Sequence, residues 1–130
     1  MTRTSSDRGA AALEFALVVP VLLALVLGII EFGRAYNIQT TLSNAARDGV
    51  RVMALENSVT AARTATRNSA NTLDLTRATI SVTPTSCAAT ATTPPGTATV
   101  TITYPLELLS GFLPIDDFTL TGRGTMRCNG

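Results

Sequence analysis

The chain has 130 residues, ten basic and nine acidic side chains, and a formal net charge of +1. That length suffices for one membrane helix and one small domain, and the near-zero net charge suggests neither a nucleic acid nor another acidic molecule as a partner. There is no histidine, so the commonest general base and the commonest metal ligand are both missing.

The chain opens with a short polar segment, residues 1–9, followed by an apolar run from Ala10 to Ile30. As a helix the run is ~32 Å long, which matches the ~30 Å hydrocarbon core of a bilayer. We therefore expect a processed leader over 1–9, outside the fold, and a transmembrane helix over 10–30. A secretory signal is the main alternative, but its apolar region is shorter and ends in an A-x-A-like site, whereas this run ends in GIIEFGR.

The charges that flank the apolar run predict its orientation. Arg3 and Arg8 precede it, whereas Glu31 and Arg34 nearly cancel just beyond it. Positive residues favour the cytoplasmic side of a membrane. We expect a single-pass protein of the cytoplasmic membrane, with its N-terminus inside and the rest of the chain outside.

Helical periodicity continues beyond the apolar run, over residues 31–56. Apolar and small residues recur there at spacings of three and four, and polar residues fill the other faces, as in an amphipathic helix. We expect one long helix from about Ala10 to about Glu56, with bends or soft points at Pro20 and at three glycines. The glycines are Gly28, Gly33 and Gly49, and the stripe consists of Phe32, Ala35, Ile38, Leu42, Ala45, Gly49 and Val52.

Residues 57–130 are predicted to form a small α+β domain outside the membrane. A break and N-cap at Asn57-Ser58 should start a second helix that runs from Val59 to near Asn71. The period then changes to two over residues 78–83, 98–104 and 118–128, which predicts three half-buried strands. We expect an antiparallel meander of three strands, with a solvated Thr-rich face and an inner face covered by the long helix.

Two segments between the strands invite alternative interpretations. Residues 84–97 are an irregular, Pro-rich loop, whereas residues 105–117 are apolar enough to be a lid over the small core or a contact surface for a partner subunit. Gly122-Arg123-Gly124 is interpreted as a bulge in the last strand, and a ligand site at Arg123 is the alternative. Asp116-Asp117 is interpreted as a solvated turn, because no base lies near it in the sequence.

The two cysteines, Cys87 and Cys128, lack the spacing of a zinc site. Both fall on the side placed outside the membrane, where an oxidising compartment favours a disulfide. Two buried, reduced thiols are the alternative.

The N-terminal residues resemble a known family. The string RGAAALEFAL with Pro20 behind it, within a segment from Arg8 to Ala54, is similar to TadE-like proteins, pilin-type subunits of the tight-adherence (Tad/Flp) pilus. The resemblance implies that a prepilin peptidase cuts between Gly9 and Ala10, and that Glu14 serves subunit assembly. It also implies three partners: other pilin-like subunits, the peptidase and an assembly platform in the membrane.

Glu14 also has a physical rationale. Cutting after Gly9 would create an α-amino group on Ala10, mostly charged because its pKa is ~7.7–8.0. A carboxylate near lipid is tolerated only when it is paired, so pairing with this group would favour insertion beside another subunit and set its axial register. The alternative is a glutamate at the membrane edge whose side chain reaches interfacial water.

Three hypotheses for function follow from the sequence. The first is a pilin-like subunit, with the outer domain arguing for a minor pilin or pseudopilin. The second is a signal-anchored membrane protein whose outer module binds a ligand or partner. The third is a small extracellular enzyme, which no catalytic constellation supports. We expect no enzymatic activity, cofactor or metal site.

Overall fold

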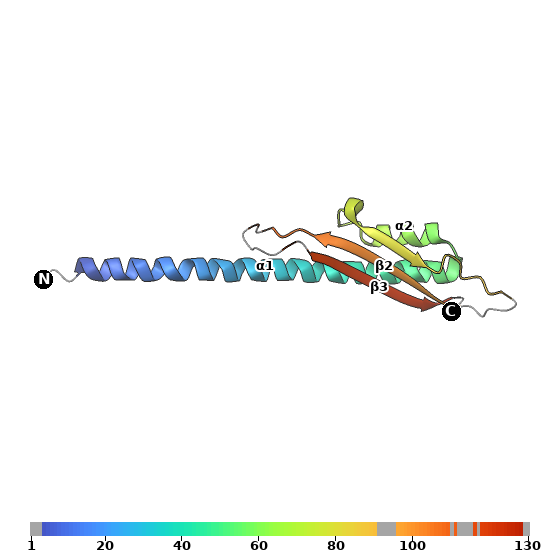
Figure 1. Cartoon of the computed structure of the whole chain (residues 1–130), viewed down its shortest axis with the longest axis horizontal. Coiled ribbons are helices and arrows are strands. Elements are labelled where there is room, and N and C mark those ends of the chain that lie inside the picture. Colours follow the sequence, from blue (N-terminus) through green and yellow to red (C-terminus); the bar gives the residue numbers. More distant parts are fainter. Residues whose placement is uncertain (1–3, 91–95, 110, 112–115, 117, 129–130) are drawn as a thin grey trace. The chain divides into compact units, whose positions relative to one another are not determined.

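The computed structural model describes residues 4–90, 96–109, 111, 116 and 118–128. The chain divides into two compact units, Met1–Arg34 and Ala35–Gly130, which are treated separately below. The elements in chain order are α1 (Thr4–Glu56), α2 (Val59–Ser69), the 3-10 turn η1 (Leu75–Arg77), β1 (Thr79–Thr83), β2 (Thr97–Leu106) and β3 (Phe118–Arg127) (Figure 1).

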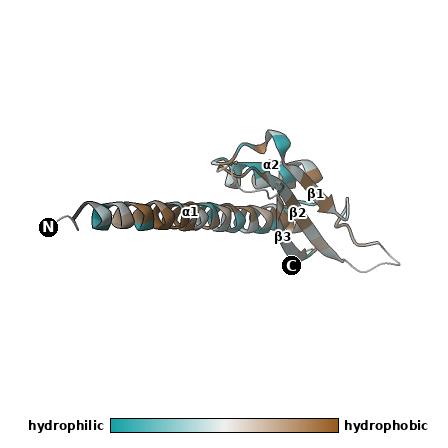
Figure 2. Ribbon diagram, turned by 60° about the vertical axis from the view of Figure 1, so that its left-hand side comes forward, coloured by the Kyte–Doolittle hydropathy of each residue, from teal (hydrophilic) through white to brown (hydrophobic). Residues whose placement is uncertain are grey.

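The first unit is the N-terminal part of α1, which is strongly hydrophobic along much of its length (Figure 2). Its large apolar side chains from Leu13 to Ile30 are exposed, except Val19, which is half-buried. Among the described residues, α1 is the helix long and apolar enough to cross a membrane. It continues through Pro20, whose missing N–H costs one helical hydrogen bond.

The helix begins at Thr4 and not at Ala10, so residues expected to lie outside the fold extend it. Asp7 in the first turn explains part of this difference, because a carboxylate there interacts favourably with the helix dipole. The three alanines after Gly9 are the strongest helix formers.

In the second unit, one face of α1 supplies the helical side of a small core. Within the expected stripe, Ile38, Leu42, Ala45 and Gly49 are buried, whereas Ala35 and Val52 are half-buried and Phe32 is 74% exposed. The opposing side comes from inward residues of the strands. The buried core residues of α1 here are Ile38, Leu42, Ala45, Ala46, Val50, Met53 and Ala54, and those of the sheet are Val82, Ala98, Val100, Ile102 and Leu106.

The sheet is the expected three-stranded antiparallel meander, in the order β1-β2-β3. β2 extends two residues beyond the predicted end, through Pro105 and Leu106. A proline is tolerated in this central strand because β1 pairs with β2 only as far as Thr103, so Pro105 lies past the end of one neighbour.

The outward side chains of the strands form a regular array, which we call the hydroxyl face. Alternation along the strands puts these side chains on the side away from the core. Three complete rungs cross the sheet, and the other outward residues belong to β2 and β3. The rungs are Thr79–Thr103–Thr121, Ser81–Thr101–Arg123 and Thr83–Thr99–Thr125, and the remaining members are Thr97, Pro105, Thr119 and Arg127.

Gly122 and Gly124 do not form the predicted bulge. The β2–β3 register passes through them without an extra residue, so that interpretation was wrong. A Cβ atom at Gly122 would overlap the main-chain carbonyl of Leu42, and one at Gly124 would lie 2.7 Å from the carbonyl oxygen of Ala46. The two glycines therefore let the backbone of β3 touch the backbone of α1.

The junction between the two helices is as expected at Ser58, whose hydroxyl accepts the N–H of Ala61 and caps α2. Asn57 before it has a φ of 50°, a left-handed conformation that asparagine tolerates better than most residues. Gly49 also has a packing role, because a Cβ there would overlap the Thr66 side chain of α2.

We expect Gly124→Ala to lower the free energy of unfolding by roughly 1–3 kcal/mol, because the added methyl must push β3 away from α1. Thermal unfolding of the full chain in detergent, followed by circular dichroism, measures the change. Gly96→Ala is the matched control, since a Cβ at Gly96 meets nothing within 4 Å. Equal stability of the two variants would contradict the close-contact role of Gly124.

Candidate functional site

The candidate processing site, Gly9-Ala10, lies on exposed helix near the start of α1. A Cβ at Gly9 would meet nothing within 4 Å, so packing within the chain does not require glycine there. Glycine inside a helix is less favourable than alanine by about 1 kcal/mol. The fold therefore gives no reason for Gly9, in contrast to Gly122 and Gly124.

Glu14 lies one helical turn after Ala10, a rise of ~6 Å along the axis. Its side chain is exposed, and it makes no hydrogen bond or ion pair in the part of the chain that the structure describes. The neighbouring side chains on the helix are apolar and exposed, with Leu13 at 65% and Phe15 at 71%. Glu14 is thus a single carboxylate on an apolar surface.

A second carboxylate of the first unit, Glu31, lies at the other end of the apolar run. It is nearly buried, at 8% exposed, and its Oε2 lies 3.7 Å from Nη1 of Arg34. The two residues are three positions apart, a spacing that brings side chains together on a helix. The sequence indicated that their charges cancel, and the structure adds that they form a pair.

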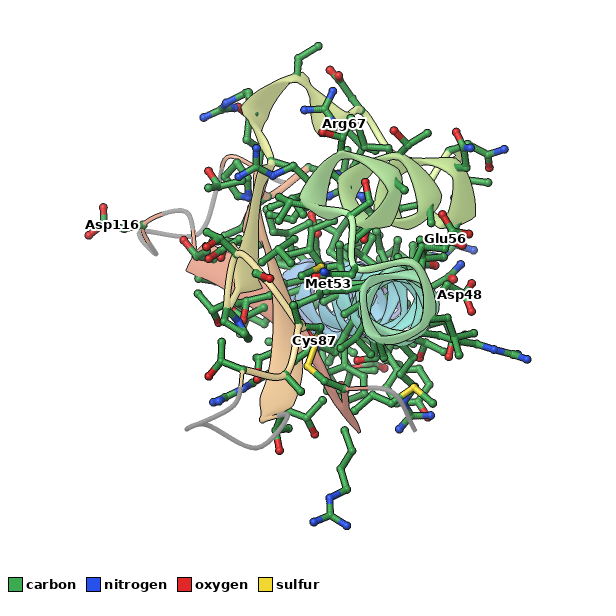
Figure 3. All side chains as sticks on the ribbon, turned by 90° about the vertical axis from the view of Figure 1, so that its right-hand side faces the viewer. Asp48, Met53, Glu56, Arg67, Cys87 and Asp116 are labelled. Carbon is green, nitrogen blue, oxygen red and sulfur yellow. A yellow bond between two sulfur atoms is a disulfide. The ribbon has the colours of Figure 1, made fainter. Side chains whose placement is uncertain are left out.

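The expected disulfide joins Cys87 to Cys128, with 5.3 Å between their Cα atoms (Figure 3). It ties the segment after β1 to the end of β3, and the N–H of Cys128 donates to the carbonyl of Gly96 at 2.9 Å. The N–H of Cys87 donates to Oδ1 of Asn57 at 2.5 Å. The bridge is thereby connected to the end of α1.

Asn57 has a structural role beyond the break between helices that the sequence predicts there. Its backbone N–H donates to the carbonyl of Met53, which ends α1, and its side chain holds Cys87. An asparagine directly after a helical pattern and before an N-cap serine is a local signal for such a turn. Its long-range bond to Cys87 has no counterpart in the sequence.

The remaining candidates do not form a metal site in the described residues. No group of three His, Cys, Asp or Glu side chains there could hold a metal ion. Asp116 is exposed and projects away from the helices (Figure 3), and Asp117 lies outside the described residues. Of the apolar residues in the segment 105–117, Leu106 is buried, Leu108 is half-buried and Leu109 is 69% exposed. Phe112, Leu113 and Ile115 lie outside the described residues.

Asp74 shows a carboxylate with a structural task. Hydrogen bonds from the Thr76 hydroxyl and backbone N–H lower its pKa, because they favour the charged form. These bonds cap η1. The lowered pKa of Asp74 is therefore explained by this capping role and gives no indication of a catalytic one.

Residues 9–51 match the model of the TadE-like protein family. The match begins at Gly9, includes Glu14 and the apolar run, and ends within the part of α1 that packs in the core. The resemblance seen in the sequence is thus confirmed over this segment. No curated protein and no solved structure matches the chain.

Replacing Cys128 by serine should destabilise the second unit by about 4 kcal/mol, because the bridge closes a loop with a separation of 41 residues. Thermal unfolding of the variant measures this loss. Thiol labelling of the denatured wild-type chain supplies the control: no cysteine should react before reduction and two should react after it. Two reactive cysteines before reduction would refute the bridge.

Proposed function

We propose that this protein is a pilin-like subunit of a tight-adherence pilus, made as a membrane precursor and cut between Gly9 and Ala10 by a prepilin peptidase. One observation carries the proposal: an exposed apolar helix bears one carboxylate, Glu14, within a TadE-like segment that begins at Gly9. Neither Gly9 nor Glu14 has a packing role in the described chain.

The proposed location is the cytoplasmic membrane, which the apolar part of α1 would cross over residues 10–30. Arg3 and Arg8 would stay on the cytoplasmic side, and residues beyond Ile30 would lie outside. The Cys87–Cys128 bridge supports this orientation, because disulfides persist in oxidising compartments outside the cytoplasm.

Glu14 would act after the cut. The new amino group of Ala10 and the Glu14 carboxylate would lie on one face of the helix, one turn apart. When two such helices lie side by side in lipid, the carboxylate of one can pair with the amino group of the other. Because an unpaired charge in lipid costs several kcal/mol, the pair favours insertion of a new subunit at one axial position.

The second unit, Ala35–Gly130, would form the outer unit of the protein. This outer unit supports a minor pilin or pseudopilin role. Beyond the helix it carries a folded core, a sheet and a disulfide, more than a subunit needs for helix packing alone. In this role the protein would contact other pilin-like subunits, the prepilin peptidase and the assembly platform. It would act in priming, assembly or adhesion without enzymatic chemistry.

One observation favours the alternative, a signal-anchored protein whose outer module binds a ligand or partner. In the intact chain the Gly9–Ala10 bond lies inside α1, where the backbone is not extended for a peptidase. Glycine at position 9 reduces the cost of unwinding this turn. Processing therefore requires local opening of the helix, and its occurrence separates the two candidates.

Gly9→Arg should leave the full-length precursor in the membrane, because a long charged side chain replaces the hydrogen atom beside the cut bond. Intact-mass measurement of the membrane-extracted protein detects the nine residues that remain. Gly96→Arg is the control, since position 96 is also open space in the structure, and it should be processed normally. A mature N-terminus between Phe15 and Tyr36 would instead indicate a secretory signal.

Glu14→Ala should leave membrane insertion and processing intact, since it removes a charge from an apolar segment. Co-purification with other pilin-like subunits should fall at least about tenfold, the loss expected for one charge-assisted hydrogen bond. Glu56→Ala, at the exposed end of α1, provides the comparison and should co-purify normally. Wild-type co-purification of Glu14→Ala would rule out the pairing role.

A further inference from the structure

We propose that the hydroxyl face of the sheet binds an acidic polysaccharide. This inference does not depend on processing at Gly9, and it assigns a ligand class to the outer unit. The evidence is the composition of the face, its regular register and its charge.

The composition of the hydroxyl face is narrower than strand formation requires. Of its thirteen outward positions, nine are threonine, one is serine, two are arginine and one is proline. Threonine suits a strand, but so do valine, isoleucine and tyrosine, and none of these occurs at an outward position. Glutamate, which commonly makes an exposed sheet soluble, is also missing from it. What distinguishes this face is a dense set of hydroxyl groups.

The register makes these hydroxyls a regular array. Rungs such as Thr83–Thr99–Thr125 repeat across neighbouring strands ~4.8 Å apart, and members of one strand follow each other at ~6.8 Å. Each hydroxyl can both donate and accept a hydrogen bond, as sugar hydroxyls do. An open array of this kind fits a ligand that is itself a repeating chain of hydroxyl groups.

The positive charge of the hydroxyl face indicates that its ligand is acidic. Arg123 lies in the middle rung, opposite Thr101, and Arg127 lies opposite Thr97. Neither arginine forms an ion pair in the described chain, and no acidic residue occupies an outward strand position. Arginine binds carboxylate with two parallel hydrogen bonds, so a sugar polymer with carboxylate groups satisfies both kinds of side chain.

The neighbouring acidic residues do not neutralise this face. Glu107, which follows β2, pairs with Arg77, and Asp116 precedes β3 and projects into solvent (Figure 3). Both adjoin the end of the sheet where Leu106 pairs with Phe118, whereas Arg123 and Arg127 lie farther along β3. The positive charge is therefore concentrated toward the Cys128 end.

Other ligand classes fit this face less well. A single-stranded nucleic acid needs aromatic side chains for its bases, and the outward positions have none. A duplex needs more phosphate contacts than two arginines provide. A lipid surface needs large apolar side chains for insertion, which are also missing. Each sugar unit would bind weakly, and several units engaged at once would raise the overall affinity.

The test is binding of the full chain, in detergent micelles, to immobilised alginate, a polymer of uronic acids, with neutral dextran as the comparison. The wild-type chain should bind alginate and not dextran, and Arg123→Gln should weaken binding at least tenfold. Thr101→Val, which removes one hydroxyl and keeps a strand-forming shape, should weaken it several-fold. Arg67→Gln on α2 makes the same change in net charge away from the sheet and should bind as the wild type does.

Several outcomes would overturn the proposal. They are the absence of alginate binding, equal binding to dextran, unchanged binding in both sheet variants, or an equal loss in Arg67→Gln. Self-association that Arg123→Gln abolishes, without alginate binding, would instead make this face a contact between copies of the chain. Because the assay uses the unprocessed chain, its result is independent of cleavage at Gly9, and thermal unfolding verifies that each variant is folded.

Discussion

The second unit depends on the direct contact between the backbone of β3 and the backbone of α1. Gly122 and Gly124 create this contact, because a side chain at either position would collide with the helix at Leu42 or Ala46. The cross-strand partners of these glycines on β2 are Ile102 and Val100, both fully buried. The large side chains on the central strand and the absence of side chains at the two glycines of the edge strand together fit the sheet to the cylindrical surface of the helix.

This contact has a consequence for the opposite side of the sheet. Since the inner positions of β3 alternate with the outer ones, fixing Gly122 and Gly124 against the helix forces Arg123 outward, between two rows of hydroxyls. A slip of one residue would bury the arginine and expose the core positions. The disulfide at Cys128 and the hydrogen bond from Gln39 to the Thr121 carbonyl hold β3 in the observed register.

The sequence predicted the elements of this fold well because their patterns are local. Alternation located the three strands, Ser58 marked the start of α2, and spacings of three and four marked the buried face of α1. It failed at Gly122 and Gly124 because a glycine required by a distant helix looks the same as a glycine in a bulge. The hydrogen bond between Asn57 and Cys87 was not predicted for a related reason. The two residues are thirty positions apart, and periodicity carries no information about such distant pairs.

The two parts of the proposed function are also separable in the chain. The TadE-like segment, residues 9–51, includes Glu14 and most of the buried residues that α1 contributes to the core, but neither β2 nor β3. The sheet must still complete the core, which constrains its inner positions and the two glycines of β3. Its outward positions are not under this packing constraint, since Thr101 and Arg123 are not part of the buried cluster. The outward residues of the hydroxyl face can therefore be replaced to suit another ligand, without altering the helix that would anchor and assemble the subunit.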